Sequence, residues 1–262
     1  MRTPARAGLT AAPFDADFLV VGSGFGGAVS ALRLAQKGYT VVVLEQGRRW
    51  RTEGVPRTSW SLKDYLWLPR LGFYGIQVLS FFRHVTVLHG RGVGGGSLVY
   101  ANTLVRPEPD VLQGPDWGGE DWNGRLDLHY REARRMLGAA ASPGVGRADE
   151  LLREIGRDMR GVDTLRVHDL GVWFGDAGVE VPDPYFGGQG PPRTGCTLCG
   201  ACMIGCRVGA KNTLDKNYLW LAERRGAVIH PETLVEDLRP REGGGYQVAT
   251  VRSTDRILKR RR

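Results

Sequence analysis

Residues 17–27 read DFLVVGSGFGG, and residues 40–45 read TVVVLE, with a helical pattern between the two stretches. The apolar run 18–21 is typical of a buried parallel strand, and the run 41–44 predicts a second one. The apolar positions after residue 27 fit one face of an amphipathic helix. The order strand, glycine turn, helix and strand predicts a Rossmann-like α/β fold with a parallel sheet and flanking helices.

Each glycine of the turn has its own predicted role at the pyrophosphate of a dinucleotide. Gly22 permits the tight turn, Gly24 lets the backbone approach the phosphates, and Gly27 lets the helix pack close to the sheet. The free N–H groups at the helix start, around Phe25 and Gly26, favour the negative charge of the phosphates.

Glu45 ends the second predicted strand, 18 residues after Gly27. An acid at this position can accept hydrogen bonds from a ribose diol, and it disfavours the 2′-phosphate of NADP. The alternative is a glycine turn that binds no nucleotide. We disfavour that alternative because the strand, the helix and the acid are all in place.

The composition indicates a soluble, globular chain. Of its 262 residues, 42% are hydrophobic and 24% are charged. We expect a disordered tail over residues 1–14 and a domain over residues 15–262. The N-terminus lacks the apolar segment of a signal peptide, so the expected compartment is the cytoplasm.

The net charge is +8, and four positive charges lie in the last four residues, 259–262. Such a run could contact nucleic acid or anionic lipid. No nucleic-acid-binding module accompanies the charge, so we expect no nucleic-acid partner.

Residues 71–88 are unusually apolar, but Gln77, Arg83 and His84 interrupt them, and the stretch is too short to span a bilayer. Three interpretations stay open: a lid over an apolar substrate, a face in peripheral contact with a membrane, or a core segment that leads into a strand over residues 85–88. We prefer the last.

A second glycine loop, GRGVGGGS, covers residues 90–97 and follows that predicted strand. A backbone without side chains can lie flat against a planar ring or a diphosphate. A nicotinamide dehydrogenase has no need of a second such loop, whereas a flavin held along its whole length does. The alternative is a flexible connector, which the apolar residues on both sides argue against.

The two loops together resemble the glucose–methanol–choline (GMC) family of FAD-dependent oxidoreductases, in its bacterial cholesterol oxidase-like branch. The resemblance runs from about residue 15 to the C-terminus. It is carried by residues 22–27, LEQG at 44–47, residues 90–97 with Asn102, VPDPYFG at 181–187 and GAKNTLDKNY at 209–218.

The resemblance implies FAD as cofactor and oxidation of the CH–OH group of a small apolar alcohol by hydride transfer to FAD. A sterol is the favoured substrate, which would place the protein in steroid metabolism. The cofactor-binding residues that we predict are Gly22, Gly24, Phe25, Gly26, Gly27, Glu45, Gln46, Arg91, Gly92, Gly95, Gly96, Ser97, Asn102 and Val235.

The resemblance also bears on particular residues and segments. The backbone of Val235 is expected to contact the adenine, whereas the role of Asn102 is uncertain because family members often place Asn at the position of Tyr100. We expect residues 161–195 to form an excursion on the substrate side. The catalytic histidine of the family lies in a C-terminal half that this chain lacks, so we name no catalytic residue.

All four cysteines, Cys196, Cys199, Cys202 and Cys206, follow the spacing C-x2-C-x2-C-x3-C. This spacing is typical of iron–sulfur ligation, although Arg207 replaces the usual proline. Zinc and free thiols are alternatives, and disulfides are disfavoured in the cytoplasm. A cluster would favour a dehydrogenase that passes electrons to an acceptor protein, rather than an oxidase.

The remaining elements follow from periodicity and breakers. We expect helices over residues 126–137, 149–159 and 212–225, and strands over 227–230, 235–238 and 246–252, the last two joined by the glycine turn 243–245. A last alternative is a truncated fragment that binds FAD without catalysing a reaction. In either case we expect the isolated chain to lack alcohol oxidase activity.

Overall fold

The computed structural model describes residues 15–144, 146–159 and 166–255. The predicted tail over residues 1–14, the basic run 259–262 and the start of the excursion predicted over 161–195 lie outside these residues. The predicted domain limits stay a prediction.

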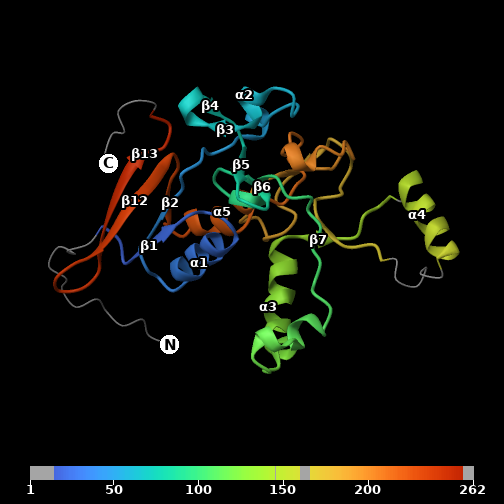
Figure 1. The fold of residues 1–262 in the computed structure, drawn as a ribbon, viewed down its shortest axis with the longest axis horizontal. Helices are drawn as coiled ribbons and strands as arrows, with labels where there is room; N and C mark the ends of the chain where they lie inside the picture. Colours follow the sequence, from blue (N-terminus) through green and yellow to red (C-terminus); the bar gives the residue numbers. More distant parts are fainter. Residues whose placement is uncertain (1–14, 145, 160–165, 256–262) are drawn as a thin grey trace.

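The centre of the fold is a three-stranded parallel sheet in the order β1–β2–β11 (Figure 1). Its strands are β1 (Phe18–Val21), β2 (Val41–Leu44) and β11 (Val228–His230). Helix α1 (Phe25–Gln36) connects β1 to β2, as the sequence predicts. The predicted Rossmann-like unit is therefore confirmed.

The main hydrophobic core forms where α1 and α5 (Tyr218–Glu223) meet this sheet. Helix α1 buries mostly small residues, Ala28, Ala31 and Ala35, beside Leu32, so its backbone can lie close to the strands. On the other side of the contact, α5 buries Leu219.

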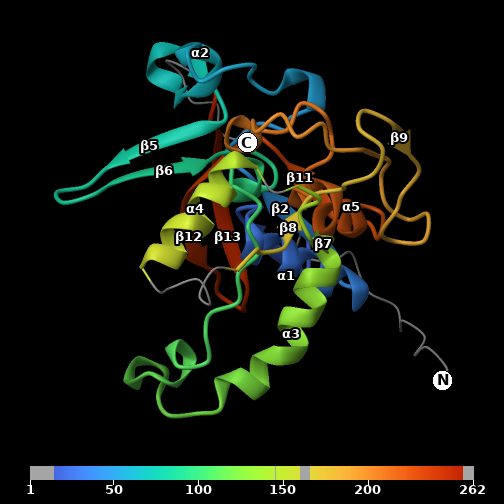
Figure 2. The ribbon, with the colours of Figure 1, turned by 90° about the vertical axis from the view of Figure 1, so that its right-hand side faces the viewer.

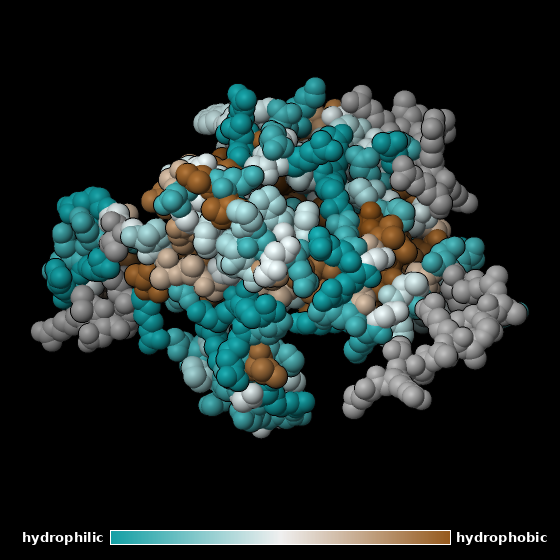
Figure 3. All heavy atoms as spheres, turned by 180° about the vertical axis from the view of Figure 1, so that it is seen from behind, coloured by the Kyte–Doolittle hydropathy of each residue, from teal (hydrophilic) through white to brown (hydrophobic). Residues whose placement is uncertain are grey.

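Strand β1 forms one edge of the sheet. Within the described part of the chain it pairs with β2 alone. Its side chains Phe18, Leu19 and Val21 are exposed, and the exposed fraction of Val21 reaches 61%. Seen from behind (Figure 3), hydrophobic side chains form separate patches on a surface that is otherwise largely hydrophilic.

The small antiparallel sheets surround this centre. Strands β12 (Thr233–Pro240) and β13 (Tyr246–Arg252) form a long hairpin across a turn at residues 243–245, whose three glycines all have positive φ. The three short pairs are β3 (Trp67–Leu68) with β4 (Phe73–Tyr74), β7 (Ala139–Ala140) with β8 (Leu170–Gly171), and β9 (Glu180–Val181) with β10 (Arg193–Thr194).

The remaining helices are α2 (Leu62–Tyr65), α3 (Trp122–Met136) and α4 (Arg147–Asp158). Figure 1 shows α3 and α4 extending away from the sheet. Helix α3 begins four residues before the predicted start because the Asp121 carboxylate accepts a hydrogen bond from the Gly124 N–H and caps the helix. None of the described helices is long and apolar enough to cross a membrane.

The helix predicted over residues 212–225 is wrong in its first half. Residues 214–216 form a separate 3-10 turn, and α5 begins only at Tyr218. Asn217 interrupts the helix with φ −137° and ψ −94°, and its side chain accepts a hydrogen bond from the Tyr218 N–H. The asparagine therefore acts as a helix cap rather than as a helix residue.

The preferred interpretation of residues 71–88 as a core segment is also wrong, although the strand predicted over residues 85–88 is confirmed by β6 (Thr86–Gly90). The stretch forms a hairpin of β5 (Gln77–Phe81) and β6, which projects from the body in Figure 2. Only its base is buried: Ile76 is 1% exposed, whereas Phe81 and Phe82 near the tip are 76% and 63% exposed.

The difference in burial between the tip and the base of this hairpin leads to a first prediction. Replacing Phe81 and Phe82 with serine should change the free energy of unfolding by no more than about 0.5 kcal/mol per site, because neither ring is packed. The matched change Ile76→Ala at the base should lower it by about 2–5 kcal/mol. Urea unfolding followed by circular dichroism measures both. A large loss from the tip variants would show that the rings are packed in solution.

Candidate nucleotide-binding site and cysteine loop

The first glycine turn has the geometry that its predicted roles require. Gly22 has φ +88°, which favours glycine. A Cβ at Gly24 would meet no described atom within 4 Å, so this position is open to a ligand. A Cβ at Gly27 would lie 1.9 Å from the carbonyl oxygen of Gly22, so only glycine lets α1 pack this close to β1.

The second glycine loop lies directly against the first. A Cβ at Gly95 would lie 2.8 Å from the Cα of Gly24. The Ser23 hydroxyl accepts a hydrogen bond of 3.1 Å from the N–H of Gly94, 71 positions later in the sequence. Gly96 is open, with no described atom within 4 Å of a Cβ position. The two loops thus form one glycine-lined surface.

Glu45 is buried at the end of β2, beside the first turn. Its Oε2 accepts hydrogen bonds from the Ser23 hydroxyl at 2.6 Å and from the Ser23 N–H at 3.0 Å. Its Oε1 accepts one from the N–H of Gly47 at 2.8 Å. These bonds fix the carboxylate at the predicted place and leave lone pairs that could accept hydrogen bonds from a ribose. The ribose contact itself stays a prediction.

Ser23 is the residue of this site that the sequence-based prediction missed. Its hydroxyl links Glu45 to the second glycine loop, and its side chain is fully buried. The sequence does contain a signal for this role: a small polar residue lies between two turn glycines, and an acid ends the next strand.

Replacing Ser23 with alanine removes both of these bonds. We expect the free energy of unfolding to fall by about 1–3 kcal/mol, since the Gly94 N–H and one carboxylate oxygen lose a buried partner. The matched control is Ser30→Ala, at an exposed position of the following helix α1, which should change the free energy of unfolding by no more than about 0.5 kcal/mol. Thermal unfolding of both variants tests this, and equal melting temperatures would show that the Ser23 bonds do not form in solution.

Gln46 and Val235 lie where β2 meets β12. The Gln46 carbonyl accepts a hydrogen bond from the Ser253 hydroxyl, and the Thr233 N–H donates to the Glu45 carbonyl at 2.8 Å. Val235 follows two residues later, at an irregularity in the pairing of β12 with β13. This places its backbone near the Glu45 end of the site, and its adenine contact stays a prediction.

The other predicted residues of the second loop differ in what they face. A Cβ at Gly92 would lie 2.6 Å from the Trp50 ring, so Gly92 packs against protein. The Ser97 hydroxyl donates to the Gly94 carbonyl at 2.7 Å and accepts from the Leu214 N–H at 3.0 Å. Both residues therefore hold the shape of the loop.

Arg91 lies at the start of this loop, and Asn102 lies five residues after its end. The Arg91 guanidinium lies 5.6 Å from the Trp67 ring centre, and burial lowers its pKa while the attraction of Glu45 raises it. Asn102 is buried with φ +67°, and its Oδ1 has no hydrogen-bond partner among the described residues. A buried amide oxygen without a partner is typical of a site that receives a ligand or water.

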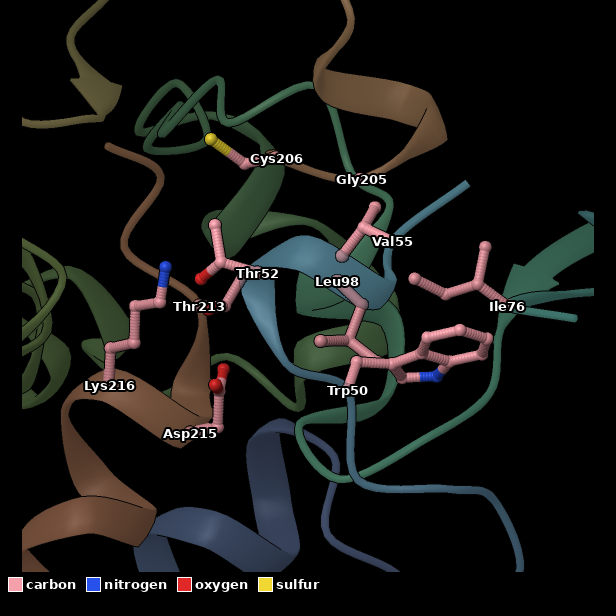
Figure 4. Close-up of a pocket in the computed structure, with 10 residues that line it drawn as sticks. All are labelled: Trp50, Thr52, Val55, Ile76, Leu98, Gly205, Cys206, Thr213, Asp215 and Lys216. Carbon is pink, nitrogen blue, oxygen red and sulfur yellow. The ribbon is translucent and has the colours of Figure 1, made fainter. Parts of the chain in front are cut away.

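Beside the loop lies a small cavity, with a volume of about 20 Å³ (Figure 4). Asp215, Lys216 and Cys206 line it together with apolar residues that include Trp50. Burial lowers the pKa of Lys216, and the Oδ1 of Asp215 is buried without a described hydrogen-bond partner. The volume suits a single water molecule and excludes an alcohol substrate.

All four cysteines line a second, larger cavity of about 190 Å³. They are free thiols. Burial raises the pKa of the Cys206 thiol, but hydrogen bonds from backbone N–H groups and the charge of Lys216 outweigh burial and leave that pKa below its usual value. Among the described residues, no three His, Cys, Asp or Glu side chains are grouped to hold a metal ion.

Lys211 connects this cysteine loop (residues 196–206) to the second glycine loop. Its side chain is fully buried, and its Nζ donates hydrogen bonds to the carbonyls of Tyr100 at 2.6 Å, Cys202 at 2.9 Å and Leu98 at 3.1 Å. Burial lowers the pKa of Lys211 to about 8, against the attraction of Cys202 and Cys206.

A parallel sheet, a bare glycine turn and an acid fixed at the end of the second strand define a dinucleotide-binding Rossmann domain. Comparison with known proteins agrees, because residues 20–52 match the family profile of the NAD(P)-binding Rossmann-like domain. The chain is also similar to an FAD-dependent oxidoreductase structure from Chaetomium thermophilum, with a TM-score of 0.51 and 18% identity, over 93% of this chain and 43% of that one. At this identity the likeness concerns the fold alone.

Comparison with known sequences gives more specific relatives within the class of dinucleotide-binding proteins. The chain is 50% identical to a cholesterol oxidase of Mycobacterium tuberculosis over 95% of its own length and 44% of the relative. It is 43% identical to a cholesterol oxidase of Acinetobacter baumannii over 95% of its length and 47% of that relative. It is 32% identical to an uncharacterized GMC-type oxidoreductase of M. tuberculosis, over 89% of this chain and 34% of that protein.

Over most of its length the chain is similar to cholesterol oxidases and to a GMC-type oxidoreductase, which supports a GMC, cholesterol oxidase-like N-terminal portion. It spans less than half the length of these curated relatives.

Proposed function

We propose that this chain is the FAD-binding portion of an oxidoreductase that acts on the CH–OH group of an apolar alcohol, a sterol in the first place. The observation that carries the proposal is the contact between the two glycine loops, held by Ser23, next to the fixed carboxylate of Glu45. The names of the relatives, cholesterol oxidase in two organisms, support the substrate class.

The residues present fit an extended flavin nucleotide. The open Gly24 and the start of α1 would hold the pyrophosphate, since both offer backbone N–H groups and no side chain. Glu45 would accept hydrogen bonds from the adenosine ribose, and the backbone of Val235 would contact the adenine. The open Gly96 would let the loop lie along the flavin.

When bound, FAD supplies the acceptor for the hydride that leaves the alcohol carbon. This chain's residues would orient the nucleotide, and we assign the role of catalytic base to none of them. The exposed hairpin tip at Phe81 and Phe82 supports a lid or a membrane-facing role as part of the same proposal. We further propose a cytoplasmic location.

A second candidate function is a flavin–iron–sulfur dehydrogenase, which would pass electrons to an acceptor protein rather than to dioxygen. The observation that favours it is the cavity shared by the four cysteines and Asn102, which lies five residues after the second glycine loop. A non-catalytic FAD-binding fragment is the remaining alternative.

Titration of the purified chain with FAD and separately with NAD, followed by fluorescence, tests the proposal. We expect FAD to bind and NAD to bind weakly or not at all. Glu45→Gln should weaken FAD binding at least about tenfold, because a charged hydrogen-bond acceptor is lost. The matched control Glu242→Gln, on an exposed turn, should bind FAD normally.

Two outcomes would contradict the proposal. Folded chain that stays colourless, rejects FAD and accepts NAD would overturn the cofactor assignment. Peroxide formed from a sterol by the isolated chain would overturn the expectation that this chain alone is inactive as an oxidase.

A further inference from the structure

The larger cavity, beside the cysteine loop, has a mostly apolar wall. Its volume is about 190 Å³. The aliphatic and aromatic residues that line it are Ala101, Leu170, Val172, Phe174, Leu198, Ala201, Val208 and Ala210. A wall of this kind favours apolar groups and disfavours charged ones. The cavity is therefore suited to an apolar molecule.

The four cysteines belong to the same wall. They line the cavity as free thiols, and no three His, Cys, Asp or Glu side chains in the described ranges are grouped to hold a metal ion. A free cysteine behaves as a small apolar side chain, and its S–H group is only a weak hydrogen-bond donor. The cysteines thus extend the apolar surface that the other side chains begin.

Three more strongly polar side chains also line the cavity, and two of them already have partners. The ammonium of Lys211 donates to three backbone carbonyls, which uses all three of its N–H bonds. The Ser142 hydroxyl donates to the Gly144 carbonyl at 3.3 Å. The third is Asn102, which is 1% exposed and whose Oδ1 has no hydrogen-bond partner among the described residues. A molecule that satisfies this oxygen must carry a hydrogen-bond donor.

The backbone around Asn102 is held in place by pairing. Asn102 has φ +67°, a conformation that asparagine tolerates better than most other residues with a side chain. Its carbonyl accepts a hydrogen bond of 2.9 Å from the Gly171 N–H, and Thr103 forms a β-bridge with Leu170. The unsatisfied amide is therefore carried by a fixed segment at the wall of the cavity.

The volume limits what can enter. An apolar cavity of about 150 Å³ holds one benzene molecule. A cavity of about 190 Å³ therefore has room for one six-membered ring with a hydroxyl group. Leu198 and Cys199 line the cavity and are exposed, so it opens to solvent on this side. The rest of a larger alcohol, such as the other rings of a sterol, would extend through this opening.

The cavity adjoins the surface that we assign to the flavin. Ala101 and Asn102, which line it, follow shortly after the second glycine loop. Lys211 joins this segment to the cysteine loop through the carbonyls of Tyr100, at 2.6 Å, and Cys202, at 2.9 Å. A hydroxyl group bound at Asn102 would therefore lie next to the cofactor loop.

We propose that this cavity binds the hydroxyl-bearing ring of an apolar alcohol, and that the O–H group donates a hydrogen bond to the Oδ1 of Asn102. The inference rests on the proposed function and adds to it the place of the alcohol and a residue that binds it. An amide oxygen accepts hydrogen bonds but takes up no proton at neutral pH, so Asn102 orients the hydroxyl and another group must accept its proton.

The same bond distinguishes substrate from product. Oxidation converts the alcohol into a ketone, which has no O–H group to donate. The ketone therefore leaves the Asn102 oxygen unsatisfied again, and a buried polar group without a partner is unfavourable. The product should leave the cavity more readily than the alcohol.

Binding of cyclohexanol and of cyclohexanone to the purified chain tests the proposal. Saturation-transfer NMR of dilute protein measures both dissociation constants. We expect cyclohexanol to bind at least about tenfold more tightly than cyclohexanone, because only the alcohol satisfies the Asn102 oxygen. Equal affinity for the two compounds, or binding of neither, would overturn the proposal.

A separate fluorescence titration with FAD keeps this inference apart from the proposed function. A chain that binds cyclohexanol with the expected preference and rejects FAD would refute the proposed function and leave the alcohol site standing. A chain that binds FAD and neither ring compound would refute the alcohol site alone.

Variants of the cavity wall sharpen the test. Asn102→Gly removes the acceptor at a φ that glycine adopts without strain, so it should lose the preference for the alcohol. Ala201→Phe narrows the cavity and should abolish binding of both compounds. The matched control Met203→Phe, at an exposed position of the same loop outside the cavity lining, should bind both normally. A preference retained in Asn102→Gly, or unchanged binding in Ala201→Phe, would overturn the proposal.

Discussion

Replacing Gly27 with alanine should leave little folded protein and no measurable binding of FAD. The new Cβ would lie 1.9 Å from the Gly22 carbonyl oxygen and 3.3 Å from a Val20 methyl group. Because the Gly22 oxygen belongs to the backbone, the clash can be removed only if α1 moves away from β1. That movement disrupts the hydrophobic core that both elements share. We expect a loss of more than about 4 kcal/mol, a large part of the stability of an ordinary domain.

The matched control is Gly26→Ala, one residue earlier in the same helix. A Cβ there meets no described atom within 4 Å, so the folded chain should be unchanged or more stable by about 0.5–1 kcal/mol. Thermal unfolding and the yield of soluble protein compare the two variants. Equal melting temperatures would show that α1 and β1 do not pack as described.

Replacing Arg193 with methionine should have the second largest effect, a loss of about 3–5 kcal/mol. The guanidinium is almost fully buried and donates to the Asn212 Oδ1 at 3.0 Å and to the Lys216 carbonyl at 2.6 Å. It also donates to the carbonyls of Pro191 and Pro192. Methionine fills much of the volume but leaves these acceptors without a donor.

An exposed arginine provides the comparison. Arg239 pairs with Asp237 at 2.6 Å on the open surface of β12, where ion pairs contribute about 0–1 kcal/mol. Arg239→Met should therefore change urea unfolding little. Similar losses in both variants would mean that the Arg193 bonds are not formed in solution.

The sequence alone predicts those features of the fold that depend on residues close together in the chain. The strand, turn and helix over residues 17–45 follow from apolar periodicity and from glycines whose neighbours lie within a few positions. The second glycine loop was recognisable from its composition, since a run so poor in side chains has few uses in a folded chain.

The sequence was insufficient where the cause lies far along the chain. The role of Ser23 depends on Gly94, 71 positions away, and no local pattern reports that contact. The hairpin over residues 77–90 was misjudged because its apolar content resembles that of a buried strand. Whether another layer covers it is decided by tertiary structure. The helix over 212–225 failed because the backbone of one residue, Asn217, departs from helical geometry.

The open side of β1 has a consequence for handling the protein. Among the described residues only β2 pairs with β1, so the other edge of β1, flanked by Phe18 and Val21, offers its backbone donors and acceptors to an extended peptide in solution. The isolated chain should scatter more light as its concentration rises. Added salt should not suppress the scattering, because the attraction is apolar and directional rather than ionic. Dilute stocks and short storage times are therefore the conditions under which its properties can be measured.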